Sequence, residues 1–184
     1  ATKAIKKNME SRGGGILSLD LINKCDILPY YFQLHLRFKT AEAMGANFIN
    51  SCLECIAKEM MIYAKNDNLI NEKKEELEIV MSILSNYVPE CLVNVSVSCN
   101  IEDFKLKENI IDGSNFAKRI VNASKIAYIE PYRAVTNNKG IMNGIDALII
   151  ATGNDFRAIE AGAHAYASRS GQYRSLSTAY IKDN

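Results

Sequence analysis

The chain has little net charge, few histidines and no long apolar run, and each of these absences excludes a class of protein. Its 184 residues carry 22 basic and 21 acidic side chains, so the formal net charge is +1. Such a surface gives no electrostatic attraction to nucleic acid or to an anionic membrane. No apolar run approaches the roughly 20 residues of a membrane-spanning helix, and no signal peptide is recognisable. We expect a cytoplasmic protein without nucleic-acid or membrane partners.

Two histidines and five cysteines offer little for a metal centre or a disulfide framework. Cys52 and Cys55 form a single C-x-x-C pair, and the second pair that a zinc site of this kind needs is missing. We therefore interpret the cysteines as small buried side chains in a reducing compartment, and we predict no metal site. His164 lies among small residues of a helical stretch, where a packed, hydrogen-bonded core histidine is the favoured interpretation.

The first part of the chain has the pattern of a small α+β domain. Residues 1–12 read as the end of a helix, and alternating apolar residues over 16–21 and 32–38 predict a hairpin of two strands. Helical spacing then predicts a long helix from an N-cap at Thr40 to about Lys65. Further alternation over 77–83 and 92–98 predicts two more strands. The order ββαββ predicts a ferredoxin-like antiparallel sheet with a helix on one face.

The pattern becomes helical in the second part, and we place a domain boundary near residue 106. Helices are predicted over 112–128, 139–151 and 155–169. Residues 1–106 then form a compact nucleotide-type domain, and residues 107–184 form part of a larger, mainly helical domain. The chain has no G-x-G-x-x-G after a strand and no Walker phosphate loop. A dinucleotide would therefore be bound without a Rossmann fingerprint.

A lysine, an arginine, amides and an aspartate gather between Pro131 and Gly171. Lys139 can stabilise negative charge that develops on a carbonyl oxygen, and Asp155 can keep the lysine charged and oriented. The alternative makes Lys139 a solvated helix end and Asp155 a residue that stabilises a helix N-terminus. Arg133 suits a substrate carboxylate, and Asn143 can hydrogen-bond the lysine or the substrate. The alternatives without a functional role are a surface salt bridge for Arg133 and a polar position near a helix N-terminus for Asn143.

The segment from Glu42 to Asn47, with the sequence EAMGAN, opens the long helix. Small residues there let the backbone approach a pyrophosphate, and a helix N-terminus favours anions. Glu42 is unsuited to a phosphate because its carboxylate repels one, so we expect it to cap the helix or to bond a ribose. A lone glycine at a helix start is weak evidence by itself.

The motifs NKGIMNGID, ATGND and AGAHAYASRSG, together with EAMGAN and the triplet Gly13–Gly15, resemble class II 3-hydroxy-3-methylglutaryl-coenzyme A (HMG-CoA) reductase over essentially the whole chain. The resemblance implies that NADH or NADPH reduces the HMG-CoA thioester in two successive hydride transfers, giving mevalonate for isoprenoid biosynthesis and free coenzyme A. It further implies the role of each matching residue: catalytic for Lys139 and Asp155, substrate-binding for Arg133 and Asn143, and cofactor-binding for Glu42, Met44, Gly45 and Asn47.

The same resemblance carries expectations about assembly and completeness. Sites of the family form between two subunits, so a homodimer is expected. Family members are more than twice this long and also use an N-terminal glutamate and a C-terminal histidine that this chain lacks. We therefore expect these 184 residues to be an incomplete piece that does not turn over alone. Lys6 suits a coenzyme 2′-phosphate and hence NADPH, but a solvated helix face explains it equally well.

Two other functions remain open from the residues alone. One is a non-catalytic, nucleotide-binding ferredoxin-like module. The other is an RNA-binding sheet, in which Tyr30, Tyr31 and Phe32 would stack on bases. The near-neutral charge and the missing RNA-binding motif make hairpin packing the better explanation for these aromatic residues.

Overall fold

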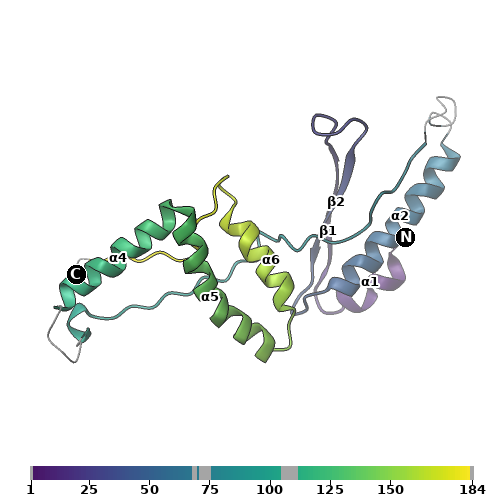
Figure 1. The fold of residues 1–184 in the computed structure, drawn as a ribbon. Helices are drawn as coiled ribbons and strands as arrows, with labels where there is room; N and C mark the ends of the chain where they lie inside the picture. The colour runs from purple at the N-terminus through teal and green to yellow at the C-terminus, as the bar shows by residue number, and fades with distance from the viewer. Residues whose placement is uncertain (1, 68–69, 71–75, 105–111, 183–184) are drawn as a thin grey trace. The chain divides into compact units, whose positions relative to one another are not determined.

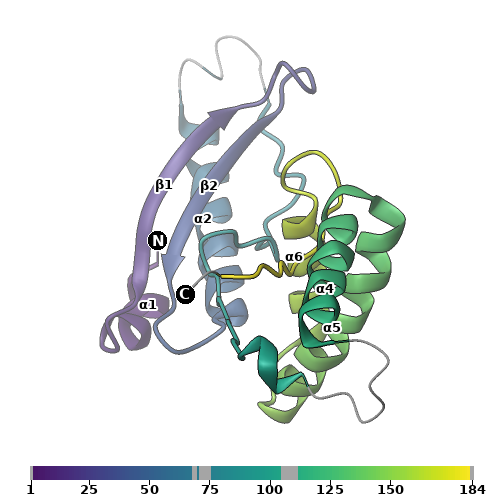
Figure 2. The same cartoon turned by 90° about the vertical axis from the view of Figure 1, so that its left-hand side faces the viewer.

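The computed structural model describes residues 2–67, 70, 76–104 and 112–182. It divides into two compact units, Ala1–Leu84 and Ser85–Asn184, which we describe separately (Figures 1 and 2). The division falls earlier than the boundary that we expected near residue 106. The function of each domain stays a prediction. The α+β class is confirmed, since helices occur together with a small antiparallel sheet.

The first unit contains the predicted hairpin. Strand β1 (Gly15–Asn23) pairs antiparallel with β2 (Phe32–Lys39), so that Leu19 lies opposite Leu36. The register shifts between Ile16 and Ser18, as at a β-bulge, which bends the strand and increases its twist. Figure 2 shows the two strands as a long curved ribbon. Burial alternates along β2 as the sequence predicts, because Leu34, Leu36 and Phe38 are half-buried. It does not do so along β1, where Leu17, Leu19 and Leu21 are exposed, so the half-buried face predicted for this strand is not formed.

Two helices complete the described part of this unit. Helix α1 (Lys3–Glu10) contacts the longer helix α2 (Ala46–Asn66), and the two lie side by side in Figure 1. Met9 of α1 and Cys52 of α2 are buried, and Cys52 has no exposed surface. Burial raises the pKa of the Cys52 thiol, and the neighbouring Cys55 raises it further. Cys52 is therefore the small buried side chain that we expected, but the expectation is wrong for Cys91 and Cys99, which are exposed.

Helix α2 starts later than predicted. Thr40 is not its N-cap, because the helix begins at Ala46 and Gly45 occupies the cap position with a left-handed φ of 77°. A Cβ atom at Gly45 would lie 2.5 Å from Cγ2 of Thr40. Glycine is therefore required at this position for two reasons: the left-handed backbone conformation, and the lack of space for a Cβ atom beside Thr40. Among the described residues, no side chain caps this end of α2.

The two further strands are not formed. Residues 76–100 contain no strand, and β1 and β2 pair only with each other in the part of the chain that the structure describes. A period-2 pattern becomes a strand only where a neighbour completes its hydrogen bonds. Val93, Val95 and Val97 are instead 89%, 85% and 97% exposed. The start of this segment is attached to α2, because the Asn50 side chain accepts a hydrogen bond from the Leu84 amide at 3.0 Å.

The second unit is helical, as predicted. A short 3₁₀ helix η1 (Ile101–Asp103) precedes α4 (Gly113–Ile129), α5 (Pro131–Ala151) and α6 (Phe156–Ala167). Helix α5 contacts both α4 and α6. The predicted bounds of α4 and α6 are correct to within two residues, but α5 begins eight residues before Lys139. No helix of the described residues is long and apolar enough to cross a membrane.

Replacing Gly45 by alanine tests the start of α2. We expect Gly45→Ala to lower the free energy of unfolding by about 1–2 kcal/mol, because alanine is strained at positive φ and its Cβ meets Thr40. Urea denaturation followed by circular dichroism measures the change. Gly144→Ala is the control: Gly144 lies inside α5 with nothing within 4 Å of an added Cβ, so alanine should stabilise the chain by up to about 1 kcal/mol. Equal unfolding midpoints for Gly45→Ala and the unmodified chain would show that the cap conformation is unimportant.

Candidate functional site

The start of α5 is fixed by one glutamate. Glu130 is the N-cap, and its carboxylate accepts hydrogen bonds from the amides of Tyr132 at 3.1 Å and Arg133 at 2.9 Å. Pro131 follows at the first helical position, where its missing N–H costs nothing. Arg133 therefore lies in the first turn of the helix with its side chain exposed. Its place beside a helix N-terminus agrees with a role in binding an anionic group.

Asn138 anchors α5 to the C-terminal segment of the chain. Its side chain is fully buried. Its amide nitrogen donates to the carbonyl of Arg174 and its oxygen accepts from the amide of Leu176, both at 2.9 Å. Sequence reasoning assigned no role to this residue, because its partners lie 36 and 38 positions away. The pair of bonds fixes the rotation of α5 at the position directly before Lys139.

Lys139 and Asn143 lie one helical turn apart on α5, so they share one face of the helix. Both side chains are exposed. Lys139 is thus a mid-helix residue, not a solvated helix end, and Asn143 is far from the helix N-terminus. Arg133 lies on the same helix but nearer its start. The structure therefore places three of the predicted site residues on one rigid element.

A tight turn carries the chain from α5 to Asp155. Gly153 takes a left-handed φ of 69°, its amide donates to Ile150, and the amide of Asn154 donates to Ile149. These two bonds form a Schellman motif, in which the amides of the residues that follow the helix bond its last carbonyl groups. Asp155 then caps α6 by accepting a hydrogen bond from the Ala158 amide at 3.1 Å. The capping role that we considered for Asp155 is present in the structure.

Lys139 and Asp155 do not form an ion pair in the described part of this chain. Lys6 and Glu10 form an ion pair with their charged atoms 2.8 Å apart, whereas the charged atoms of Lys139 and Asp155 lie more than 4.0 Å apart. Both side chains are exposed. Their proposed catalytic pairing stays a prediction, and the geometry shows only that they lie on consecutive helices joined by a short turn.

Asp146 and Glu160 form a carboxyl pair that sequence reasoning missed. The pKa of Glu160 is raised, first by hydrogen bonding with the Asp146 side chain and then by the negative charge of Asp146. The Oδ1 atom of Asp146 is buried and accepts no hydrogen bond from the residues that the structure describes. Asp146 lies seven residues after Lys139, two turns along the same face of α5.

The predicted coenzyme element lies in the first unit. Glu42 and Met44 precede the cap Gly45, and Asn47 lies in the first turn of α2; all three side chains are exposed. The helix has no acidic residue in its first turn, and no side chain in the described part of the chain caps it, so its first amides can bind an anion. Lys6 lies on α1 and pairs with Glu10 at 2.8 Å, as a solvated helix residue does.

Two further features lie outside the predicted site. His164 is exposed rather than buried, but its Nδ1 lies 2.7 Å from the Tyr173 hydroxyl, so the expected hydrogen bonding is present.

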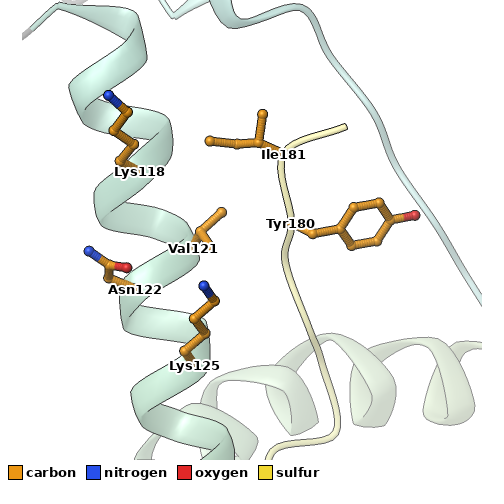
Figure 3. A pocket seen from close by; sticks show the side chains of 6 residues that line it. All are labelled: Lys118, Val121, Asn122, Lys125, Tyr180 and Ile181. Carbon is orange, nitrogen blue, oxygen red and sulfur yellow. The ribbon is translucent and has the colours of Figure 1, made fainter. Parts of the chain in front are cut away.

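A shallow cavity of about 460 Å³ lies between α4 and the C-terminal segment (Figure 3). It is lined by Lys118, Val121, Asn122, Lys125, Tyr180 and Ile181, none of which we predicted as a site residue. No group of His, Cys, Asp or Glu among the described residues is arranged to hold a metal ion.

Comparison with known proteins identifies the class of this chain. The family model of hydroxymethylglutaryl-coenzyme A reductase matches residues 1–183. The chain is 39% identical over 180 residues to a probable 3-hydroxy-3-methylglutaryl-coenzyme A reductase of Borreliella burgdorferi, and 35% identical over 166 residues to the reductase of Archaeoglobus fulgidus. These alignments cover 96% and 90% of this chain but 38% and 34% of the two relatives. The chain therefore spans little more than a third of their length.

Solved structures agree with this result. A 3-hydroxy-3-methylglutaryl-coenzyme A reductase of Streptococcus pneumoniae matches with a TM-score of 0.74 and 36% identity, over 98% of this chain and 45% of that one. The class II enzyme of the same organism, bound to NADPH in open conformations, matches with a TM-score of 0.71 and 36% identity, over 95% and 44% of the two chains. The chain belongs to the hydroxymethylglutaryl-coenzyme A reductase family.

Removal of the Asn138 side chain tests its anchoring role. We expect Asn138→Ala to lower the free energy of unfolding by about 2–4 kcal/mol, because the Arg174 carbonyl and the Leu176 amide lose their partners in a buried position. Asn122 is an exposed asparagine of α4, and Asn122→Ala serves as the control. This substitution should change the free energy of unfolding by less than about 0.5 kcal/mol. Both changes are measured by urea denaturation. Similar values for the two variants would mean that Asn138 does not anchor the C-terminal segment.

Proposed function

We propose that this chain supplies the core of an HMG-CoA reductase, an oxidoreductase that transfers two hydrides in succession from NAD(P)H to the HMG-CoA thioester. The products are mevalonate and free coenzyme A. The observation that carries the proposal is Lys139, exposed mid-helix on α5 with Asn143 one turn away and Asp155 at the start of the next helix. Membership of the reductase family supports the reaction class.

Lys139 acts on the oxygen of the thioester. As hydride reaches the carbonyl carbon, negative charge develops on the oxygen, and an ammonium group fixed beside it lowers the barrier. The same charge develops again when the second hydride reduces the intermediate. Asp155, on the following helix, keeps Lys139 charged in the assembled site. This requires the two side chains to approach each other more closely than they do in the single chain.

Arg133 and Asn143 bind the substrate. HMG-CoA carries a free carboxylate, and a guanidinium group can donate two parallel hydrogen bonds to its oxygens. Asn143 lies on the same face of α5 as Lys139, so its amide can bond either the lysine or the substrate without changing the local charge. Both side chains are exposed and therefore accessible to a ligand.

The coenzyme binds at the start of α2. The free amides of the uncapped helix N-terminus favour the pyrophosphate, and Gly45 leaves the backbone open to it. Met44 and Asn47 flank this position, and Glu42 bonds a ribose hydroxyl instead of a phosphate. The NADPH-bound relative from Streptococcus pneumoniae supports NADPH as a coenzyme, and NADH remains the alternative. Lys6, although paired with Glu10, remains a candidate partner for the 2′-phosphate.

The site is completed by assembly. A homodimer that brings a second subunit against α5 and α6 would cover the exposed faces of Lys139 and Asp155 and bring them closer together. Such an enzyme acts in the cytoplasm on soluble coenzyme A esters. A nucleotide-binding module without catalysis is the second candidate, and the uncapped start of α2 favours it equally well. The two functions differ in what Lys139 does.

Substitution of Lys139 distinguishes reduction from simple binding. In a full-length reductase that carries this segment, we expect Lys139→Ala to lower kcat by about 10²–10³-fold, because one stabilising charge on the oxyanion is lost. NADPH affinity, measured by fluorescence titration, should stay within a factor of two, which is about 0.4 kcal/mol. Lys125→Ala, an exposed lysine of α4, is the control and should leave kcat unchanged. Mevalonate formation at the original rate in Lys139→Ala would refute the proposed role.

A further inference from the structure

The corner between α4 and α5 leaves the last carbonyl groups of α4 without their usual partners. In a continuous helix each carbonyl accepts a hydrogen bond from the amide four residues later. The last two carbonyls of α4 are those of Tyr128 and Ile129. The amides four residues later, those of Tyr132 and Arg133, donate to the carboxylate of Glu130 instead. The corner therefore needs donors from another part of the chain.

Arg174, in the segment that follows α6, supplies such a donor. Its Nη1 donates to the carbonyl of Tyr128 at 3.1 Å, and its guanidinium carbon lies 4.8 Å from the centre of the Tyr128 ring. Its Nε donates to the hydroxyl of Ser170 at 3.0 Å, which holds the side chain in this direction. Beside it, Gln172 donates to the carbonyl of Ile129 at 3.4 Å. Figure 1 shows this segment passing the corner where α4 meets α5.

The backbone of Arg174 contacts the other two helices. Its amide donates to the carbonyl of Ala167, the last residue of α6, at 3.0 Å, and its carbonyl accepts from Asn138 of α5 at 2.9 Å. Among the described residues, no carboxylate lies within 4.0 Å of the guanidinium group. The charge is therefore directed at the carbonyl end of α4, where the helix dipole favours a cation. One half-buried residue thus bonds α4, α5 and α6.

We propose that Arg174 is a positioning residue for substrate binding: its side chain fixes the corner between α4 and α5 and thereby the place of Arg133 in the first turn of α5. This inference rests on the proposed function of Arg133, which binds the free carboxylate of the substrate. Lys139 depends on a different contact, because the adjacent Asn138 bonds the backbone carbonyl of residue 174, which any side chain leaves in place. Loss of the Arg174 side chain should therefore weaken substrate binding more than the chemical step.

Steady-state kinetics of a full-length reductase that carries this segment tests the proposal. We expect Arg174→Ala to raise KM for HMG-CoA by about 5–20-fold and to leave kcat within about two-fold, because a displaced Arg133 loses a contact that the ground state and the transition state share. A merely structural role predicts the reverse, since fewer folded molecules lower the apparent kcat and leave KM unchanged. Arg119→Ala, at an exposed arginine of α4, is the control and should change neither constant. An unchanged KM for Arg174→Ala, or a fall in kcat alone, would overturn the proposal.

Two milder variants extend the test to proteins that fold normally. Arg174→Lys keeps the charge but loses the planar fork that bonds Ser170 and Tyr128 together, so its KM should lie between those of the unmodified enzyme and Arg174→Ala. Arg174→Gln is neutral and shorter, and it replaces the alanine variant if that one does not fold. Its KM should rise by about 2–5-fold, and an unchanged value counts against the proposal.

Substitution of Arg133 separates this proposal from the proposed function. Arg133→Ala should itself raise KM for HMG-CoA, and Arg174→Ala should add little in that background, because both changes act through the same contact with the substrate. If Arg133→Ala leaves KM unchanged, the substrate role of Arg133 is refuted and the positioning role with it. If Arg133→Ala raises KM and Arg174→Ala does not, only the positioning role is refuted.

A double-mutant cycle in the 184-residue chain measures the contact with α4 without any substrate. Tyr128→Ala removes the ring and leaves the carbonyl in place. Urea denaturation should show that Arg174→Ala and Tyr128→Ala together destabilise the chain less than the sum of the two single changes, because the ring and the guanidinium group are in contact. Strictly additive losses would show that Arg174 does not hold the end of α4, and the proposal would be wrong.

Discussion

The second unit depends on the buried amide of Asn138. A fully buried polar side chain is tolerated only when its hydrogen bonds are complete, and here both are made to the backbone of the segment around Arg174 and Leu176. The amide therefore fixes both the rotation of α5 and the path of the C-terminal segment. Since Lys139 is the next residue, the direction of the exposed lysine is set by the buried asparagine beside it.

Local signals in the sequence predicted the elements whose stabilising contacts are also local. The hairpin of β1 and β2, helix α4 and helix α6 follow from periodicity within a few residues. The helix predicted over 139–151 leaves out the first eight residues of α5, although Glu130 and Pro131 are a recognisable helix start. The alternating valines at 93, 95 and 97 predicted a strand, but a strand needs a partner, and the sequence does not show whether one is present.

The candidate site was predictable for the residues that carry motifs and not for those that support them. Lys139, Asn143 and Asp155 belong to a recognisable pattern, and the structure places them on α5 and at the start of α6. The ion pair between Lys139 and Asp155 was expected from chemistry and is not formed in the single chain. Asp146 and Glu160 had no signal at all, since two acidic residues fourteen positions apart look like ordinary surface residues until α6 folds back against α5.

The Schellman turn at Gly153 has a consequence for how this protein can evolve. An ordinary surface loop absorbs inserted or deleted residues at little cost. Here both backbone bonds that end α5 are made inside the turn, and Asp155 begins the next helix immediately after it. An insertion of one residue would rotate α6 about its own axis and carry its N-terminus away from α5. Length variation should therefore be eliminated at this turn, and the segment can diverge only by exchanging one side chain for another.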